Sequence, residues 1–298
     1  MIFRRVLPIL LAIGHLLRGE EPREIIFCAY NLENFSEGKV ADEASPRGTK
    51  PKSPDAIATQ IRIIREISPD ILGVCEMGAP AMFERFRSDL RAAGADFPHS
   101  EYVLAGDEDR RLALLSRFPI VARESQTDLR FELSGREEQM RRGILDVTVE
   151  VNGYRLRCVG VHLKSKLPVP QGEALIRRFE AQKLRQHLDR IISADPAVNL
   201  ICYGDFNDTR NEPMFQHVVG TRGTRGFLTD LPCADASGDR WTHYWKTADQ
   251  YSRIDYLFVS SGLLREVNPT SSRIYRSADW NVASDHRPVF TAIRPEDR

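Results

Sequence analysis

The chain has 298 residues, of which 42% are hydrophobic and 28% charged, as is typical of a globular protein with a full core. Its 42 Lys and Arg residues balance its 42 Asp and Glu residues, so the formal net charge is zero. Proteins that clamp long stretches of duplex usually carry a basic excess, so this composition restricts nucleic-acid binding to a local basic patch.

The N-terminus has the pattern of a secretory signal peptide. Arg4 and Arg5 precede an apolar run from Val6 to Leu17, and polar residues follow. A membrane span needs about 20 apolar residues, so no stable membrane span is expected here. We expect residues 1–22 to be a signal peptide, residues 23–298 to form one domain, and the protein to be secreted or periplasmic. A buried N-terminal helix is the alternative.

The first half of the domain alternates strand and helix signals. Ile25–Tyr30 is an apolar, strand-like run, and the polar stretch Ser36–Lys52, with two prolines and two glycines, is expected to be flexible. Ser53 as N-cap and Pro54 at the first helical position predict a helix that ends at Ile67. The elements predicted next are a strand at Ile71–Cys75, a helix at Ala81–Ala93 and a strand at Leu112–Leu115.

The second half opens with the clearest local signal, a β-hairpin. Apolar and polar residues alternate over Leu145–Val151, and Asn152-Gly153 is a preferred two-residue turn into Tyr154–Val161. A helix at Gly172–Ser193 is predicted to bury Leu175 and to turn Arg177 towards water. Strands are expected at Leu200–Tyr203, Tyr256–Ser260 and Val289–Ile293. Antiparallel pairing mixed with helix-connected strands favours a mixed α/β domain.

The cysteines of the chain predict core packing. Four of them lie inside apolar, strand-like runs, where a thiol behaves as a small core residue. Their spacing does not match a zinc site. We therefore expect buried free thiols at Cys28, Cys75, Cys158 and Cys202.

Polar residues recur where the predicted strands end. Rigid strands feeding exposed loops are common positions for functional residues, and several such ends are hard to explain by turn formation alone. The residues concerned are Asn31, Glu33, Glu76, His162, Asp205 and Asn207, with the pair Asp285-His286 late in the chain.

The acids among these residues suit a magnesium ion. Glu76, with Asp205 or Asp285 nearby, offers the hard oxygen ligands that Mg²⁺ prefers. Glu33 could join such a site, although a surface role is equally compatible with its position.

The amides and histidines complete what phosphoryl chemistry requires. Asn31 and Asn207 donate hydrogen bonds without adding negative charge near a phosphate. His162 and His286 can transfer protons or stabilise developing charge near neutral pH. Phosphodiester hydrolysis needs a metal, a base for water and donors for the transition-state charge. The set fits this chemistry better than acyl transfer.

An ordered series of motifs resembles the endonuclease/exonuclease/phosphatase family, whose members include DNase I-like metal-dependent phosphodiesterases. The series spans about residues 25 to 293. It consists of Tyr30-Asn31-Leu32-Glu33-Asn34, Val74-Cys75-Glu76, Gly160-Val161-His162-Leu163-Lys164, Gly204-Asp205-Phe206-Asn207-Asp208, Arg253-Ile254-Asp255-Tyr256 and Ser284-Asp285-His286-Arg287-Pro288. The resemblance implies a four-layer α/β sandwich, with two mixed β-sheets face to face and helices outside, for a catalytic domain over residues 23–298.

The resemblance also implies a metal site and a base. Glu76 would be the principal ligand of Mg²⁺, with Mn²⁺ or Ca²⁺ as alternatives, assisted by Asn31 and Asp285. Asp205 would orient or deprotonate the attacking water, and Asn207 would hold a phosphate oxygen.

Further roles follow for the histidines. His286 would contact the scissile phosphate, oriented by Asp255, and His162 would bond a phosphate oxygen or assist the leaving group. Lys164 and Arg111 are candidate substrate-binding residues, balanced against ordinary surface charge. The aromatic residues of the segment 241–245 could form a wall for a base or a lipid tail, or pack beneath a loop.

Three functions compete on this basis. The first is an extracellular or periplasmic nuclease for DNA or RNA, expected to be a monomer. The second is a sphingomyelinase-like phospholipase or a small-molecule phosphoesterase; a lipid enzyme is disfavoured because no strongly apolar loop is evident. The third is a noncatalytic binding module, disfavoured because every expected metal and catalytic position is occupied.

Overall fold

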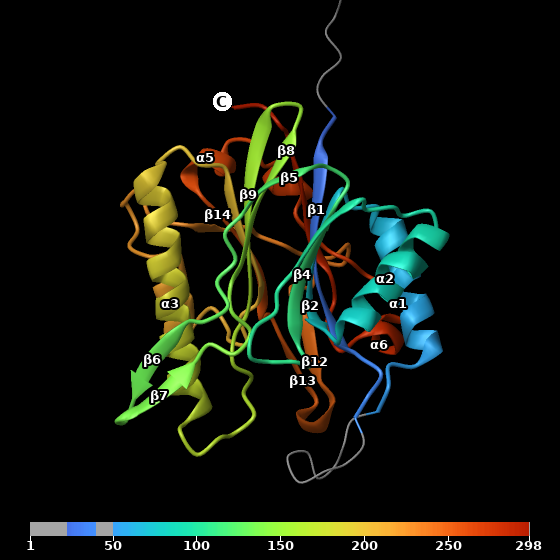
Figure 1. The fold of residues 1–298 in the computed structure, drawn as a ribbon. Coiled ribbons are helices and arrows are strands. Elements are labelled where there is room, and N and C mark those ends of the chain that lie inside the picture. The colour runs from blue at the N-terminus through green and yellow to red at the C-terminus, as the bar shows by residue number, and fades with distance from the viewer. Residues whose placement is uncertain (1–22, 40–49, 298) are drawn as a thin grey trace, which may run out of the picture.

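Two β-sheets packed face to face, with helices on both outer sides, make up the architecture of the computed structural model (Figure 1). The structure describes residues 23–39 and 50–297, so the predicted signal peptide and most of the Ser36–Lys52 stretch lie outside the described residues. None of the helices in these two ranges is long and apolar enough to cross a membrane.

The first sheet has six strands and mixed pairing. Its central strands β1 and β2 are parallel, and their other neighbours are antiparallel to them. The order is β15 (Arg273–Ile274), β16 (Val289–Ile293), β1 (Ile25–Phe35), β2 (Ile71–Met77), β4 (Arg111–Ser116) and β3 (His99–Tyr102).

The second sheet repeats this plan around another parallel pair, β9 and β10. Its order is β11 (Thr229–Asp230), β14 (Asp255–Val259), β10 (Leu200–Asp205), β9 (Tyr154–His162), β8 (Leu145–Val151) and β5 (Ile120–Arg123). Two small hairpins stand apart: β6 (Arg130–Leu133) with β7 (Arg136–Gln139), and β12 (His243–Trp245) with β13 (Gln250–Ser252).

The helices cover the outer faces of the sheets (Figure 1). The first sheet is covered by α1 (Pro54–Ile67) and α2 (Pro80–Ala92), and the second by α3 (Glu173–Ala194) and α4 (Pro213–Val219). Short helical turns complete the described chain: α5 (Ser261–Leu264), α6 (Trp280–Ala283), Lys246–Ala248 and Pro269–Ser271.

Three hydrophobic clusters lie between the four layers. One fills the space between the sheets, one joins the second sheet to α3 and α4, and one joins the first sheet to α1 and α2. Burial of these apolar faces is the main force that holds such layers together. The four-layer sandwich of mixed sheets predicted from the sequence is confirmed.

Local signals placed several elements correctly. Ser53 caps α1, its hydroxyl accepting a hydrogen bond from the Ala56 N–H at 3.2 Å, and Pro54 opens the helix. In the hairpin β8–β9, Asn152 and Gly153 both have positive φ, as a type I′ turn requires. All five cysteines, the four predicted and Cys233, are buried and free.

Two predictions were wrong in detail. Asn31 and Glu76 do not follow their strands but lie within the longer strands β1 and β2. On α3, Leu175 is 40% exposed whereas Arg177 is buried, because the side of the helix that carries Arg177 covers the polar loop after His162. There the Arg177 guanidinium donates to the carbonyl of Lys164 at 3.0 Å.

Candidate active site

The two parallel strand pairs bring four predicted site residues together. Strands that run parallel end at the same edge of a sheet. In the first sheet Asn31 is paired with Cys75, directly before Glu76, and in the second His162 is paired with Asp205. Because the sheets face each other, these four side chains meet between the ends of their central strands.

Asn31 lies at the centre of this cluster. Its amide Nδ2 is 3.0 Å from Asp205 Oδ2 and 3.4 Å from both Glu76 Oε1 and His286 Nε2. Its amide oxygen accepts the backbone N–H of Glu33 at 3.0 Å, which fixes the orientation of the side chain. One amide thus connects groups from both sheets.

His162 is buried at the floor of the cluster. Its Nε2 lies 3.5 Å from Asp205 Oδ2 and 3.7 Å from Glu76 Oε1. Burial lowers the pKa of His162 well below its usual value, and the charge of Arg142 adds to this effect. The imidazole is therefore neutral, and its Nδ1 is buried without a hydrogen-bond partner among the described residues.

Unlike the neutral His162, His286 is held in its protonated form by a carboxylate. Its Nδ1 is 2.9 Å from Asp255 Oδ2, and both side chains are buried. Burial opposes the imidazolium charge, but Asp255 and Asp205 outweigh it and raise the pKa of His286 well above its usual value. The second histidine is therefore protonated, and its Nε2 lies 3.7 Å from Asp205 Oδ2.

Asp205 combines burial with neighbouring negative charge. Burial raises the pKa of Asp205 to about 7; Asp255 and Glu76 raise it further, and His286 acts in the opposite direction. A carboxylate with such a pKa can accept a proton near neutral pH, which is what a general base requires.

Asn207 lies beside Asp205 but is engaged with the backbone. Its N–H donates to Asp205 Oδ1 at 2.8 Å, and its amide Nδ2 donates to the carbonyl of Leu163 at 3.0 Å. Both Asn207 and Glu76 have positive φ, at 53° and 62°. Left-handed backbone in non-glycine residues is costly and clusters at functional sites, so the surrounding structure must hold both residues in place.

The two predicted substrate-binding cations lie differently from what the sequence suggested. The Lys164 ammonium donates to the carbonyls of Ser165 and Leu167, at 3.2 and 3.0 Å, within its own loop. Arg111 donates to the Tyr102 hydroxyl at 3.2 Å. In this structure neither cation is directed into the Asn31 cluster.

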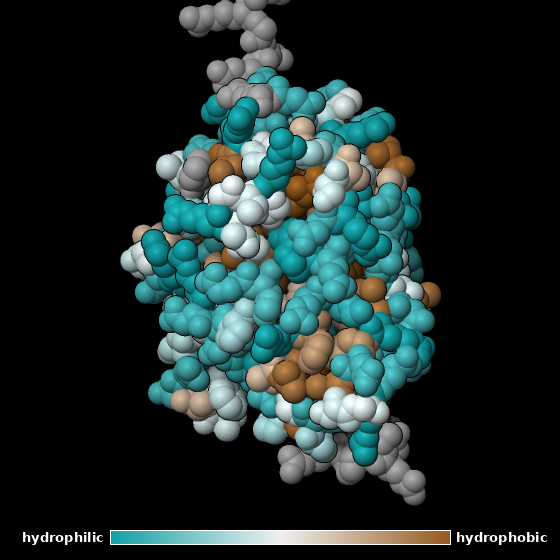
Figure 2. Space-filling model, turned by 90° about the vertical axis from the view of Figure 1, so that its left-hand side faces the viewer, coloured by the Kyte–Doolittle hydropathy of each residue, from teal (hydrophilic) through white to brown (hydrophobic). Residues whose placement is uncertain are grey.

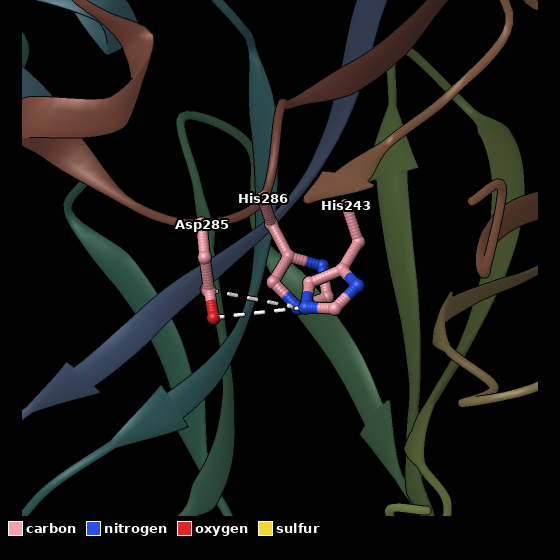
Figure 3. Close-up of side chains that lie close together, drawn as sticks. All are labelled: His243, Asp285 and His286. Atoms are coloured by element: carbon pink, nitrogen blue, oxygen red, sulfur yellow. Dashed lines mark ion pairs between the residues drawn. The ribbon is translucent and has the colours of Figure 1, made fainter. Parts of the chain in front are cut away.

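Three residues that sequence reasoning missed line the site. Arg110 Nε is 4.0 Å from Glu76 Oε2, and the Arg142 guanidinium donates to the carbonyl of His162 at 3.4 Å. His243 Nε2 is 3.7 Å from Asp285 Oδ2, next to His286 (Figure 3). Arg110 lies in the bend directly before β4, so no strand alternation marked it in place of Arg111. His243 carried no local signal.

Aromatic residues of the β12–β13 hairpin flank this corner. The Arg287 guanidinium lies 3.4 Å from the centre of the Trp241 ring, and Trp241 packs edge-on against Tyr251. Trp245 and Tyr251 are each about half exposed. Trp241 is therefore largely structural. Tyr251 stacks on Tyr244, whereas Trp245, two residues after His243, is exposed on the same face of the strand as His243.

The donor set fits a divalent cation. The Asp205 and Glu76 carboxylates both lie within 3.4 Å of Asn31 Nδ2, so two acids face one point. The Asp285 carboxylate approaches from the other side, 3.9 Å from His286 Nε2. Carboxylate and amide oxygens are the ligands that Mg²⁺ prefers, and a cation would offset the cost of grouping these acids.

The sandwich and the groups gathered at its strand ends define the DNase I-like class of α/β folds. The family model described as "Endonuclease/Exonuclease/phosphatase family" matches residues 28–286, and the chain belongs to that family. Its members are generally hydrolases of phosphodiester bonds that use a divalent metal. The resemblance drawn from the motifs is confirmed.

Solved structures of low sequence identity share the fold. An endonuclease/exonuclease/phosphatase of Bacteroides vulgatus has a TM-score of 0.64 at 14% identity, covering 92% of this chain and 100% of its own. Truncated TDP2 of Caenorhabditis elegans gives 0.61 at 18%, covering 91% and 97%. Sphingomyelinase C of Streptomyces griseocarneus gives 0.57 at 17%, covering 91% and 99%. No match was found among curated proteins.

Proposed function

We propose that the protein is a Mg²⁺-dependent phosphodiesterase that cleaves DNA or RNA outside the cytoplasm. The observation that carries the proposal is the convergence of acidic, amide and imidazole groups at the ends of two parallel strand pairs, together with Asp255 of β14 and His286 of the loop before β16. The converging residues are Asn31, Glu76, His162, Asp205, Asp255 and His286.

Glu76 would hold the metal ion, assisted by Asp285. Asn31 would assist once its amide turns, because its Nδ2 and not its oxygen faces Glu76 and Asp205 in this structure. When bound, such an ion supplies positive charge that polarises a phosphoryl oxygen. Arg110, which lies 4.0 Å from Glu76 in this structure, is placed to meet a phosphate oxygen once a cation neutralises that carboxylate. The positive charge needed at the phosphate is thus local and consistent with zero net charge.

Different side chains of the protein carry out the proton transfer and the stabilisation of charge. Asp205, with its raised pKa, accepts the proton of the attacking water. The protonated His286, oriented by Asp255, stabilises charge that develops on the phosphate oxygens. His162 is neutral and buried, so it serves as a hydrogen-bond partner for a phosphate oxygen or the leaving group rather than as a fixed charge.

Exposed aromatic side chains favour nucleic acid over a small diester. Trp245 and Tyr251 are exposed on the β12–β13 hairpin that carries His243, and unpaired bases stack on such side chains at about 1–3 kcal/mol each. Single-stranded regions are therefore the expected substrate.

The same aromatic residues support a second candidate, a lipid phosphodiester, because tryptophan and tyrosine also favour membrane interfaces. The β6–β7 hairpin does not add to this case, since its Phe131 and Leu133 are buried against α3. The face that carries α3 and this hairpin is mainly hydrophilic, with a small apolar area near its lower end (Figure 2).

The test uses the purified full chain with bis-p-nitrophenyl phosphate, single-stranded and plasmid DNA, RNA and sphingomyelin vesicles. Each is assayed with Mg²⁺ and with EDTA, and Glu76→Gln serves as the metal-site control. We expect Mg²⁺-dependent cleavage of the small diester and of nucleic acid, fastest for single strands. Cleavage of sphingomyelin alone would replace the nuclease by the second candidate. Turnover that survives EDTA, or none on any substrate, would overturn the proposal.

We also propose that residues 1–22 direct export and are removed. The basic, apolar and polar order of that segment supports this. Cell fractionation with N-terminal sequencing of the mature protein is the test, and an intact N-terminus in the cytoplasm would contradict it.

A further inference from the structure

A buried arginine on α3 contacts both of the chain segments that follow the central strands of the second sheet. The side chains of Arg177 and Asp208 are only 4% and 7% exposed, and Arg177 Nε lies 3.1 Å from Asp208 Oδ2. The same guanidinium donates from Nη1 to the carbonyls of Lys164 and Ser165, at 3.0 and 3.4 Å. Asp208 belongs to the segment after β10, whereas Lys164 and Ser165 belong to the segment after β9. One guanidinium group therefore joins the two segments.

Both segments lie directly beside residues of the active site. The first leaves the sheet at His162, and the second carries Asn207. Asn207 has a φ of 53°, a left-handed conformation that persists only where the surrounding structure holds it. Its amide Nδ2 donates to the carbonyl of Leu163 at 3.0 Å, and its N–H donates to Asp205 Oδ1 at 2.8 Å. A shift of either segment would therefore move Asn207 and Asp205 relative to His162.

Other buried side chains hold one segment each. Glu180 of α3 accepts the N–H of Lys164 at 2.6 Å, in the segment after β9. The Tyr256 hydroxyl donates to the carbonyl of Asp208 at 3.2 Å, in the segment after β10. Neither of these contacts fixes the distance between the two segments, whereas the guanidinium of Arg177 does.

The chemistry of arginine suits this task. A guanidinium presents five donors in a planar fork, so it can meet a carboxylate and backbone carbonyls at the same time. A lysine carries all of its donors on one nitrogen and can reproduce only part of this arrangement. Lys166 Nζ, 3.4 Å from Asp208 Oδ1, is 48% exposed and pairs with the same carboxylate from the loop itself.

We propose that Arg177 is a positioning residue for the phosphodiesterase reaction. It holds the segments after His162 and Asp205 in one arrangement, and it is too deeply buried to meet substrate itself. The inference rests on the proposed function, because it concerns the same site. Small misplacements of aligned groups slow the chemical step, whereas the groups that bind substrate in its ground state stay in place. Loss of Arg177 should therefore lower kcat and leave KM nearly unchanged.

The experiment compares Arg177→Met, which keeps an apolar stem, with Arg185→Met as the matched control. Arg185 lies eight residues further along α3, about 12 Å away. Its guanidinium likewise donates to two backbone carbonyls, those of Val218 and Gly226, at 2.9 and 3.1 Å. The full chain is assayed with Mg²⁺ and bis-p-nitrophenyl phosphate. We expect Arg177→Met to lower kcat about 10–10²-fold, Arg177→Lys to be intermediate, and Arg185→Met to keep the wild-type kcat.

Hydrogen exchange, followed by mass spectrometry, reports on the segments without any turnover. In Arg177→Met the amides of residues 163–172 and 206–210 should exchange faster than in the wild type. In Arg185→Met the faster amides should instead be those of residues 218–226. The two variants thus remove similar contacts from one helix and are expected to loosen different parts of the chain.

Equal kcat values for Arg177→Met and Arg185→Met, or unchanged exchange in the two segments, would overturn the proposal. If Arg177→Met does not fold, as judged by circular dichroism, its combination with Asp208→Asn replaces it with the same expectation, because no unpaired buried carboxylate is then left. A wild type that cleaves no phosphodiester would remove the phosphodiesterase, whereas hydrogen exchange would still decide whether Arg177 holds the two segments.

Discussion

Asp205 and Asp255 are paired across neighbouring antiparallel strands, yet their surroundings give them different tasks. Asp255 is bound to an imidazolium, whereas Asp205 faces Asn31 and the metal ligands. Asp205→Asn should lower kcat about 10²–10⁴-fold while the protein stays folded, because it removes the base and keeps the shape. Hydrolysis of bis-p-nitrophenyl phosphate measures this. Asp128→Asn, on the exposed surface, should be unaffected; substantial residual activity in Asp205→Asn would refute its role.

The Asp255–His286 pair makes a prediction about pH. Asp255 keeps His286 protonated through neutral pH, so activity that depends on the imidazolium declines only at alkaline pH. In Asp255→Asn the pKa of His286 falls, and the alkaline limb of kcat/KM should move to lower pH. A pH–rate profile of both proteins tests this. An unchanged alkaline limb would show that the charge of His286 is not used.

Site residues that belong to a sequence motif could be predicted. Site residues that are placed only by tertiary contacts could not. Asn31, Glu76 and Asp205 followed from motifs and meet in the structure. His243 could not be inferred, because it reaches Asp285 through a hairpin that closes far along the chain. Lys164 was predicted to bind substrate because it lies in the same motif as His162, but its ammonium makes its hydrogen bonds within its own loop.

At the scale of elements, capping and turn residues predicted the helix start and the hairpin that they determine locally. Ser53 and Asn152-Gly153 fixed the start of α1 and the β8–β9 hairpin, since both signals are local. The short hairpins β6–β7 and β12–β13 have strands of only four and three residues, which is too short for a pattern to stand out, so they escaped prediction.

The α3 helix shows why a buried face need not be apolar. Glu180, buried on that face, accepts the Lys164 N–H at 2.6 Å and anchors the loop that follows His162. Burial raises the pKa of Glu180 to about 7. The folded state therefore keeps a proton that the unfolded chain releases above about pH 4.5, and the resulting stability is lost as pH rises through about 7.

This linkage can be measured with Glu180→Gln. As pH rises from 4.5 to about 7, the free energy of unfolding of the wild type should fall relative to the variant, by roughly 3 kcal/mol at most. Urea unfolding below and above this pH window is the measurement. Glu84→Gln, exposed on α2, should give no such difference. Parallel pH dependences for the wild type and Glu180→Gln would contradict the assignment.

At the scale of the whole molecule, the two sheets meet closely around one tyrosine. Tyr203 of the second sheet lies where a Cβ on Gly73 of the first would be 2.1 Å from its ring. Gly160, its neighbour on β9, is similarly crowded, with a Cβ 2.7 Å from the ring. The missing side chain at Gly73 allows the sheets to approach at the level of Tyr203, and the one at Gly160 leaves room for the ring within its own sheet. The sequence predicted the sandwich but not this contact, since it depends on how the sheets face each other.

Gly73→Ala should therefore destabilise the protein by about 1–3 kcal/mol or more, because the ring has no room to move in the filled core. Tyr203→Phe should be nearly neutral or stabilising, because the Tyr203 hydroxyl is buried without a partner among the described residues. Chemical denaturation of both variants is the measurement. A tolerated Gly73→Ala would mean that the sheets can separate locally at little cost.

The five buried thiols can also be used to detect when parts of the folded protein open. Cys28 lies in the cluster beneath α1 and α2, Cys202 in the one beneath α3, and Cys75, Cys158 and Cys233 between the sheets. A thiol reagent can reach each sulfur only when its layer opens, because a buried thiol is both shielded and protonated. The number of labels on each molecule, counted by mass, would therefore distinguish partial opening of one layer from unfolding of the whole chain.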